Sequence, residues 1–98
     1  MANALSSDEL NTALGSLNGW SHENDMITKT FELPSYMAGL AFATTVGTIA
    51  EAHDHHPDMM VTYKKVKVSF TTHDAGSKVT QKDIDAATAI EAVGYPKA

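Results

Sequence analysis

The chain has 98 residues, seven lysines without arginine, no cysteine and a formal net charge of -5. The missing cysteine excludes disulfides, thiolate metal sites and a cysteine nucleophile, and an acidic chain without arginine argues against nucleic acid as a direct ligand. We find no apolar run near the roughly 18 residues of a membrane span and no signal-peptide pattern at the N-terminus. These features predict one domain over residues 1–98, in the cytoplasm and away from membranes.

The N-terminal third predicts a short helix and a β-hairpin. Residues 6–9 have capping-box spacing, and the leucines that follow at helical intervals predict a helix ending near Gly15 or Gly19. Two strand-like segments then occupy residues 20–23 and 26–33, joined by a turn-forming Asn-Asp pair.

The rest of the chain alternates in the same way. The longest helical candidate covers residues 35–53, and strands are predicted at 59–63 and 66–72, the second with clear two-residue alternation. Another capping-box pattern at residues 80–83 begins a last helix, which ends near Gly94.

The predicted order is therefore α-β-β-α-β-β-α. Hairpins give antiparallel pairs, so the simplest solution is an α+β fold of two layers, with three helices on one face of a four-stranded antiparallel sheet. If strand 66–72 lies at an edge of that sheet, it could pair with a second subunit.

Four of the five histidines lie between residues 53 and 73. Three belong to the segment His53-Asp54-His55-His56-Pro57 after the long helix, and His73 follows the best strand. Ends of elements are where folds commonly assemble pockets, and the proline favours an extended backbone at the residue before it. His55 and His56 should therefore point in different directions.

Glu51 stands four residues before His55. If the last helical turn continues, its carboxylate can reach the His55 ring. A carboxylate partner favours the protonated imidazole, an arrangement suited to general acid–base chemistry near neutral pH.

Two alternatives to a catalytic site stay open at this point. Three imidazoles could hold zinc or iron, although adjacent histidines on a tight corner rarely point at one ion. The histidines could also be solvated loop residues, which is the interpretation we favour for His53 and His22. For His55, His56 and His73, spacing alone leaves the solvated alternative and a functional site equally open.

The wider pattern resembles the signature of the pterin-4a-carbinolamine dehydratases. In that signature an acidic residue lies four before a His-His-Pro corner, an aromatic six after the proline, a histidine ten after the aromatic, and an aspartate ten later. The matching positions here are Glu51, His55-His56-Pro57, Tyr63, His73 and Asp83. The resemblance covers roughly residues 5–94 and includes Gly19-Trp20 before the first strand.

This resemblance implies an α+β fold, assembly into homodimers or homotetramers, and a hydro-lyase activity. The reaction would convert 4a-hydroxytetrahydrobiopterin to quinonoid dihydrobiopterin and water, which recycles the pterin after aromatic amino acid hydroxylases have used it. No cofactor and no metal are implied. Further partners would be such a hydroxylase, or a transcription or assembly factor.

The resemblance also assigns the site. The catalytic positions it implies are His55, His56 and His73, and the substrate-binding positions are Glu51, Pro57, Thr72, Asp74 and Ala75. We expect His55 and His73 to be the acid–base pair on opposite sides of the pterin, with His56 binding and orienting it.

Two residues depart from the family pattern. Met59 stands where members often carry an aromatic residue, and Ser77 stands where a second glycine usually follows Gly76. Both departures bear on efficiency and substrate preference. The alternative function is a non-catalytic dimerisation or assembly cofactor of the same fold, and an assay of pterin dehydration discriminates between the two.

Overall fold

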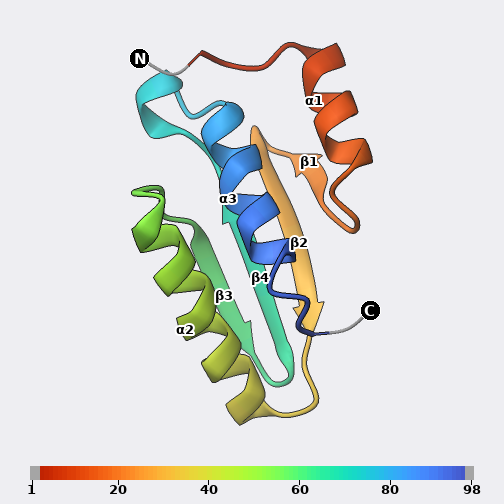
Figure 1. Ribbon diagram of the computed structural model, residues 1–98, viewed down its shortest axis with the longest axis vertical. Helices are drawn as coiled ribbons and strands as arrows, with labels where there is room; N and C mark the ends of the chain where they lie inside the picture. The colour runs from red at the N-terminus through yellow and green to blue at the C-terminus, as the bar shows by residue number, and fades with distance from the viewer. Residues whose placement is uncertain (1–2, 97–98) are drawn as a thin grey trace.

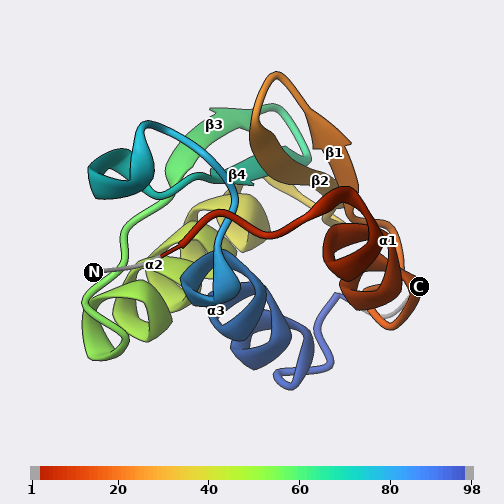
Figure 2. The same ribbon diagram turned by 90° about the horizontal axis from the view of Figure 1, so that it is seen from above.

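The computed structural model describes residues 3–96. The elements in chain order are α1 (Ser7–Gly15), β1 (Ser21–Glu23), β2 (Met26–Glu32), α2 (Tyr36–Ala52), β3 (Asp58–Thr62), β4 (Lys65–Phe70), the 3₁₀ turn η1 (His73–Ala75) and α3 (Gln81–Glu91). The predicted order and the predicted α+β fold are confirmed. All three α-helices lie on one side of the sheet, with α2 along β3 and α1 toward β1 (Figures 1 and 2).

The sheet has the strand order β1-β2-β4-β3, and every neighbouring pair is antiparallel. The two hairpins therefore join through β2 and β4, with Ile27 opposite Phe70 and Phe31 opposite Val66. The edge position on which pairing through strand 66–72 depended is not found, because β4 lies between β2 and β3. The edges are β1 and β3. A strand whose alternate side chains are all buried gains most from a central position, where both of its backbone edges are also paired.

The core lies between the sheet and the helices. Its buried side chains come from the loop before β1, from the strands and from the helices, and they include Trp20, Ile27, Phe31, Phe42, Val46, Val66, Val68, Phe70 and Ile90. Phe31 and Phe42 have ring centroids 4.7 Å apart, and Trp20 lies edge-on to Phe31 at 6.1 Å. Each such side chain stabilises the fold by about 1.5–3 kcal/mol through burial, so this face fixes the register that positions the loops.

Both predicted capping boxes form. At α1 the Ser6 hydroxyl accepts from the Glu9 N–H, and the Glu9 carboxylate accepts from the Ser6 N–H. The backbone hydrogen bond from Ser6, followed by the one from its side chain, holds the pKa of Glu9 below its ordinary value. At α3 the Asp83 carboxylate accepts from the Thr80 N–H at 2.8 Å. The surroundings of the two boxes differ: the side chains of the first are exposed, and those of the second are buried.

Among residues 3–96, no helix combines the length and apolar content that a bilayer crossing needs.

Candidate active site

The turn after α2 sets the direction of the histidine segment. His53 caps the helix, and Asp54 then adopts a left-handed backbone with φ 50°. The Asp54 N–H donates to the Glu51 carbonyl and the His55 N–H donates to the Ala50 carbonyl, both at 3.1 Å. These two bonds are the Schellman pattern, which satisfies the last helix carbonyls and reverses the chain. Aspartate tolerates this conformation better than most residues.

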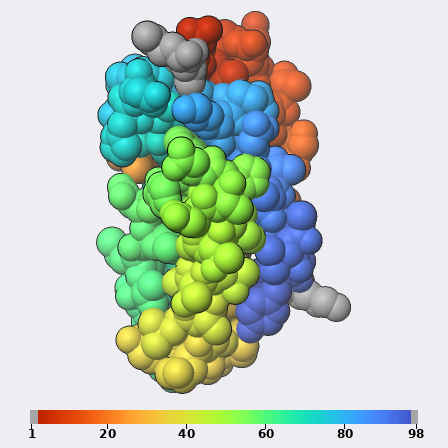
Figure 3. Space-filling view, turned by 60° about the vertical axis from the view of Figure 1, so that its left-hand side comes forward, coloured from red at the N-terminus to blue at the C-terminus, as the bar shows by residue number. Residues whose placement is uncertain are grey.

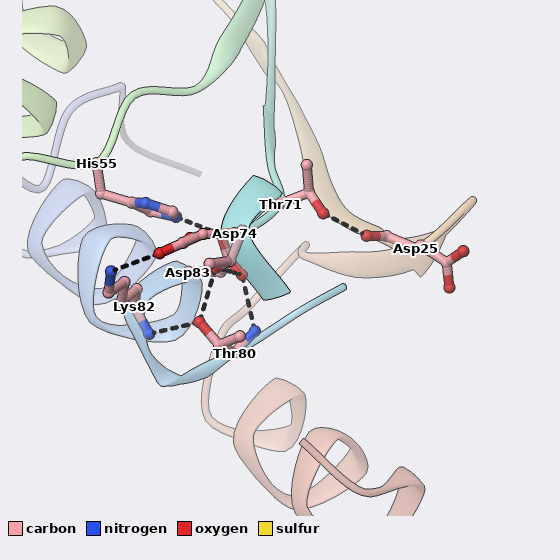
Figure 4. Close-up of polar contacts among 8 residues, drawn as sticks. Asp25, His55, Thr71, Asp74, Thr80, Lys82 and Asp83 are labelled. Carbon is pink, nitrogen blue, oxygen red and sulfur yellow. Dashed lines mark hydrogen bonds and ion pairs between the residues drawn. The ribbon is translucent and has the colours of Figure 1, made fainter. Parts of the chain in front are cut away.

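The reversal directs His55 into the protein. Its ring stacks on Phe70 with centroids 5.7 Å apart and planes 10° from parallel. His55 Nε2 lies 2.5 Å from Asp83 Oδ1, and the two side chains are 11% and 0% exposed. The other oxygen, Asp83 Oδ2, accepts from the Thr72 hydroxyl at 2.9 Å and from the Thr80 N–H at 2.8 Å. Asp83 thus joins the start of α3, the end of β4 and the turn after α2, and it fixes the orientation of the His55 ring (Figure 4).

His56 faces solvent from the same turn. Its Nε2 lies 2.6 Å from Glu51 Oε1, and the two side chains are 58% and 79% exposed. The expected contact between Glu51 and His55 is therefore wrong. That contact required the helical turn to continue, whereas the left-handed Asp54 moves His55 inward and leaves His56 beside the glutamate.

His73 comes from a different segment, the turn η1 after β4. It is exposed, and its Nδ1 lies 3.5 Å from the Ser77 hydroxyl. All three histidines expected at the site border one pocket of about 320 Å³, whose lining residues are Asp54, His55, His56, Thr71, His73, Asp74 and Lys82. In the space-filling view the end of α2 (green) borders the η1 segment (cyan) and the start of α3 (light blue) (Figure 3).

Of the predicted substrate-binding residues, Asp74 lines this pocket, whereas the other four lie around it rather than in its lining. Thr72 is 1% exposed, and its hydroxyl bonds to Asp83 and Thr80 instead of facing the pocket. Glu51 reaches the site through His56. Pro57 and Ala75 adjoin lining residues in the chain, and their contact with a substrate stays a prediction.

Sequence reasoning missed what Asp83 contacts. Its place in the capping box and in the family signature was visible, but neither signal shows that its carboxylate is fully buried against His55. Thr71 and Lys82, which also line the pocket, gave no sequence signal. Thr71 itself is tied to the β1–β2 turn, because its hydroxyl donates to the Asp25 carbonyl at 2.9 Å (Figure 4).

The remaining histidines lie apart from the pocket lining, His53 at the end of α2 and His22 on the edge strand β1. Within residues 3–96, no three histidine, aspartate or glutamate side chains are grouped as ligands for a metal ion.

Comparison with known proteins identifies the family of the chain. The family model described as pterin 4 alpha carbinolamine dehydratase matches residues 3–93. A protein of Roseiflexus sp. (strain RS-1), provisionally named a pterin-4-alpha-carbinolamine dehydratase, is 47% identical over 93 residues, covering 95% of this chain and 99% of its own. A protein of Natronomonas pharaonis with the same provisional name is 44% identical over 87 residues, covering 89% and 91%. The chain belongs to the pterin 4 alpha carbinolamine dehydratase family.

Two solved structures share the fold. The transcriptional coactivator/pterin dehydratase from Brucella melitensis has a TM-score of 0.86 and 32% identity, covering 93% of this chain and 98% of its own. A pterin dehydratase-like protein described as a RuBisCO assembly factor in the alpha-carboxysome has a TM-score of 0.60 over 78% of this chain and 87% of its own. At 18% identity, the second likeness shows the fold alone.

Proposed function

We propose that this chain catalyses the loss of water from 4a-hydroxytetrahydrobiopterin, giving quinonoid dihydrobiopterin. The observation that carries this proposal is the His55–Asp83 pair, set beside His56 and His73 in one pocket of about 320 Å³. A pocket of that size suits a small heterocycle. Membership of the family supports the same reaction class.

The reaction needs proton transfers and no redox partner. The C4a–O bond breaks as a proton reaches the leaving hydroxyl, and a ring N–H loses its proton as the C=N bond forms. Atoms and charge balance as product plus water, so no nicotinamide, flavin or metal is required. Imidazoles transfer protons of this kind near neutral pH.

The structure supports distinct roles for the three histidines. Asp83 engages His55 Nε2, which leaves Nδ1 of that ring to exchange a proton with the substrate. His73, on η1, lines the same pocket and would be the second member of the acid–base pair. His56, held by Glu51 at the exposed rim, would bind and orient the pterin.

The proposed setting is cytoplasmic recycling of a reduced pterin used by aromatic amino acid hydroxylases, carried out by one domain that forms homodimers or homotetramers. Self-association is supported by apolar side chains at the β3 edge and the start of α2: Met37, Met60 and Tyr63 are 70%, 61% and 72% exposed. Exposed apolar groups beside an unpaired strand edge favour pairing with another copy.

The second candidate function is a dimerisation or assembly cofactor. The same exposed β3 edge and α2 start favour it, and the two similar structures are described as a transcriptional coactivator/pterin dehydratase and a RuBisCO assembly factor. A purely structural protein has no need of the buried His55–Asp83 pair in an open pocket, so we rank this function second.

The direct test follows the decay of 4a-hydroxytetrahydrobiopterin with and without the protein. We expect acceleration over the spontaneous rate, and losses of about 10²-fold or more in kcat for His55→Ala and for His73→Ala. His22→Ala, an exposed histidine outside the pocket, is the matched control. No acceleration by the unmodified protein would favour the assembly function, and unchanged turnover in His73→Ala would remove that residue from the acid–base pair.

A further inference from the structure

The pocket mouth has a polar pair with no part in the proton transfers proposed above. Lys82, in the first turn of α3, extends toward Asp74 of η1, and both residues line the pocket (Figure 4). Their side chains are 51% and 66% exposed. The pair therefore lies at the exposed rim of the pocket, whereas the side chains of the His55–Asp83 contact are 11% and 0% exposed.

The distance between the two groups is too long for a direct bond. Lys82 Nζ lies 3.9 Å from Asp74 Oδ2, whereas a hydrogen bond between such groups spans about 2.7–2.9 Å. One hydroxyl oxygen about 2.8 Å from each atom fits across this gap, accepting from the ammonium and donating to the carboxylate. A water molecule can bridge the same groups, and a ligand hydroxyl that replaces it keeps both bonds.

The lining around this gap restricts the chemistry of the substituent. Its seven described members are polar or charged, with no hydrocarbon side chain that would favour a methyl group. Asp54 and Asp74 carry two negative charges against the one positive charge of Lys82, so an anionic substituent beside these three residues meets a net negative charge. A neutral substituent with hydroxyl groups satisfies both constraints.

Resting on the proposed function, we infer that Lys82 and Asp74 form a subsite that recognises a hydroxyl on the pterin substituent. The subsite selects neutral hydroxyalkyl pterins over methyl-substituted and phosphorylated ones. Lys82 and Asp74 are thus specificity-determining residues for the substituent, separate from the histidines that act on the ring.

The test compares three 4a-hydroxytetrahydropterins that differ only at position 6: methyl, dihydroxypropyl and phosphorylated hydroxymethyl. We expect the highest kcat/KM for the dihydroxypropyl substrate. Lys82→Met should reduce its preference over the methyl substrate about tenfold, through KM rather than kcat, because one charge-assisted hydrogen bond is lost. Asp74→Asn, which keeps an acceptor, should reduce the preference by less.

Lys78→Met is the matched control, since Lys78 is also 51% exposed but pairs with Asp25 at 3.1 Å outside this pocket. Its substrate preference should equal that of the unmodified protein. Equal losses for the methyl and dihydroxypropyl substrates in Lys82→Met, or a loss in kcat, would overturn the subsite. The highest kcat/KM for the phosphorylated substrate would overturn selection of a neutral substituent. If the unmodified protein turns over all three equally, the dehydratase function stands and the subsite fails; if it accelerates none, both fail.

Discussion

Two adjacent histidines each pair with a carboxylate at nearly the same distance, and the two pairs differ in how deeply they are buried. His55 Nε2 lies 2.5 Å from Asp83, and His56 Nε2 lies 2.6 Å from Glu51. The first pair is 11% and 0% exposed, the second 58% and 79%. Exposed ion pairs contribute about 0–1 kcal/mol, whereas removing one partner of a buried pair costs about 3–5 kcal/mol. Distance alone therefore says little about what a histidine–carboxylate pair does.

The difference follows from how each pair is built. Glu51 and His56 are neighbours across one turn, so their contact needs nothing beyond the end of α2. Asp83 meets His55 across 28 residues and also holds Thr72 and Thr80. The buried pair is thus part of the packing between α3 and the sheet, and its geometry is set by the core.

The largest effect should follow removal of the buried carboxylate. Asp83→Ala leaves the Thr80 N–H, the Thr72 hydroxyl and the His55 ring without their acceptor. We expect a loss of about 3–5 kcal/mol in the free energy of unfolding and no measurable dehydration. Urea unfolding followed by the fluorescence of the buried Trp20 measures the first quantity.

Asp85→Ala is the matched control for that substitution. Asp85 lies on the same helix but is exposed and bonds only to Gln81 among the described contacts. Its removal should change the free energy of unfolding by less than about 0.5 kcal/mol. Equal destabilisation by the two substitutions would show that burial does not distinguish Asp83.

A smaller effect should follow loss of one supporting hydrogen bond. Thr72→Val keeps the shape of the side chain but removes the hydroxyl that bonds Asp83 Oδ2 at 2.9 Å and Thr80 at 2.7 Å. Leaving these buried partners short of a bond should cost about 1–3 kcal/mol. Thr30→Val, on the exposed side of β2, is the control and should be near neutral. A stable Thr72→Val protein would indicate that the Asp83 network does not depend on this hydroxyl.

How far the sequence predicts this arrangement is clear from the two capping boxes. Residues 6–9 and 80–83 show the same pattern, and both begin helices as predicted. No feature of the local sequence distinguishes the exposed Glu9 from the buried Asp83. The burial of Asp83 and its contact with His55 arise from the packing of segments that are distant in the chain. Only the family resemblance marks Asp83 as special.

The same difference between local pattern and long-range packing explains why the position of β4 in the sheet and the partner of Glu51 were not predicted. The helices and strands follow from local periodicity, and the histidine segment is visible directly in the sequence, so both are predictable. The central place of β4 depends on which strands of two hairpins meet, and the partner of Glu51 depends on the left-handed backbone of Asp54. Aspartate gives a weaker signal for that conformation than glycine would.

Substitution in the exposed pair of Glu51 and His56 should have a far smaller effect than substitution in the buried pair. Glu51→Gln removes the charge beside His56 and retains an oxygen that can accept a hydrogen bond. We expect a change of at most about 0.5 kcal/mol in the free energy of unfolding and a few-fold rise in KM at most. Any effect should shrink as salt is raised toward 1 M, where the screening length falls to about 3 Å. A loss of turnover comparable to that of Asp83→Ala would contradict the assignment of His56 to binding.

The smallest effect concerns the exposed capping box at α1. Its carboxylate, Glu9, is held by local hydrogen bonds only, in contrast to the buried Asp83. Because hydrogen bonds from Ser6 hold the pKa of Glu9 below its ordinary value of 4.5, ionised Glu9 stabilises the folded state above that pH, and this contribution is lost as the pH falls through the folded-state pKa. Glu9→Gln keeps an acceptor for the Ser6 N–H and removes only the charge. The variant should therefore melt slightly below the unmodified protein at pH 7. Thermal unfolding at a series of pH values should show that this difference shrinks as the pH falls below 4.5 and vanishes below the folded-state pKa. Asp8→Asn, which removes a neighbouring charge and leaves the box intact, isolates the contribution of the hydrogen bonds; a difference for Glu9→Gln that persists or grows at low pH would show that its charge does not act through them.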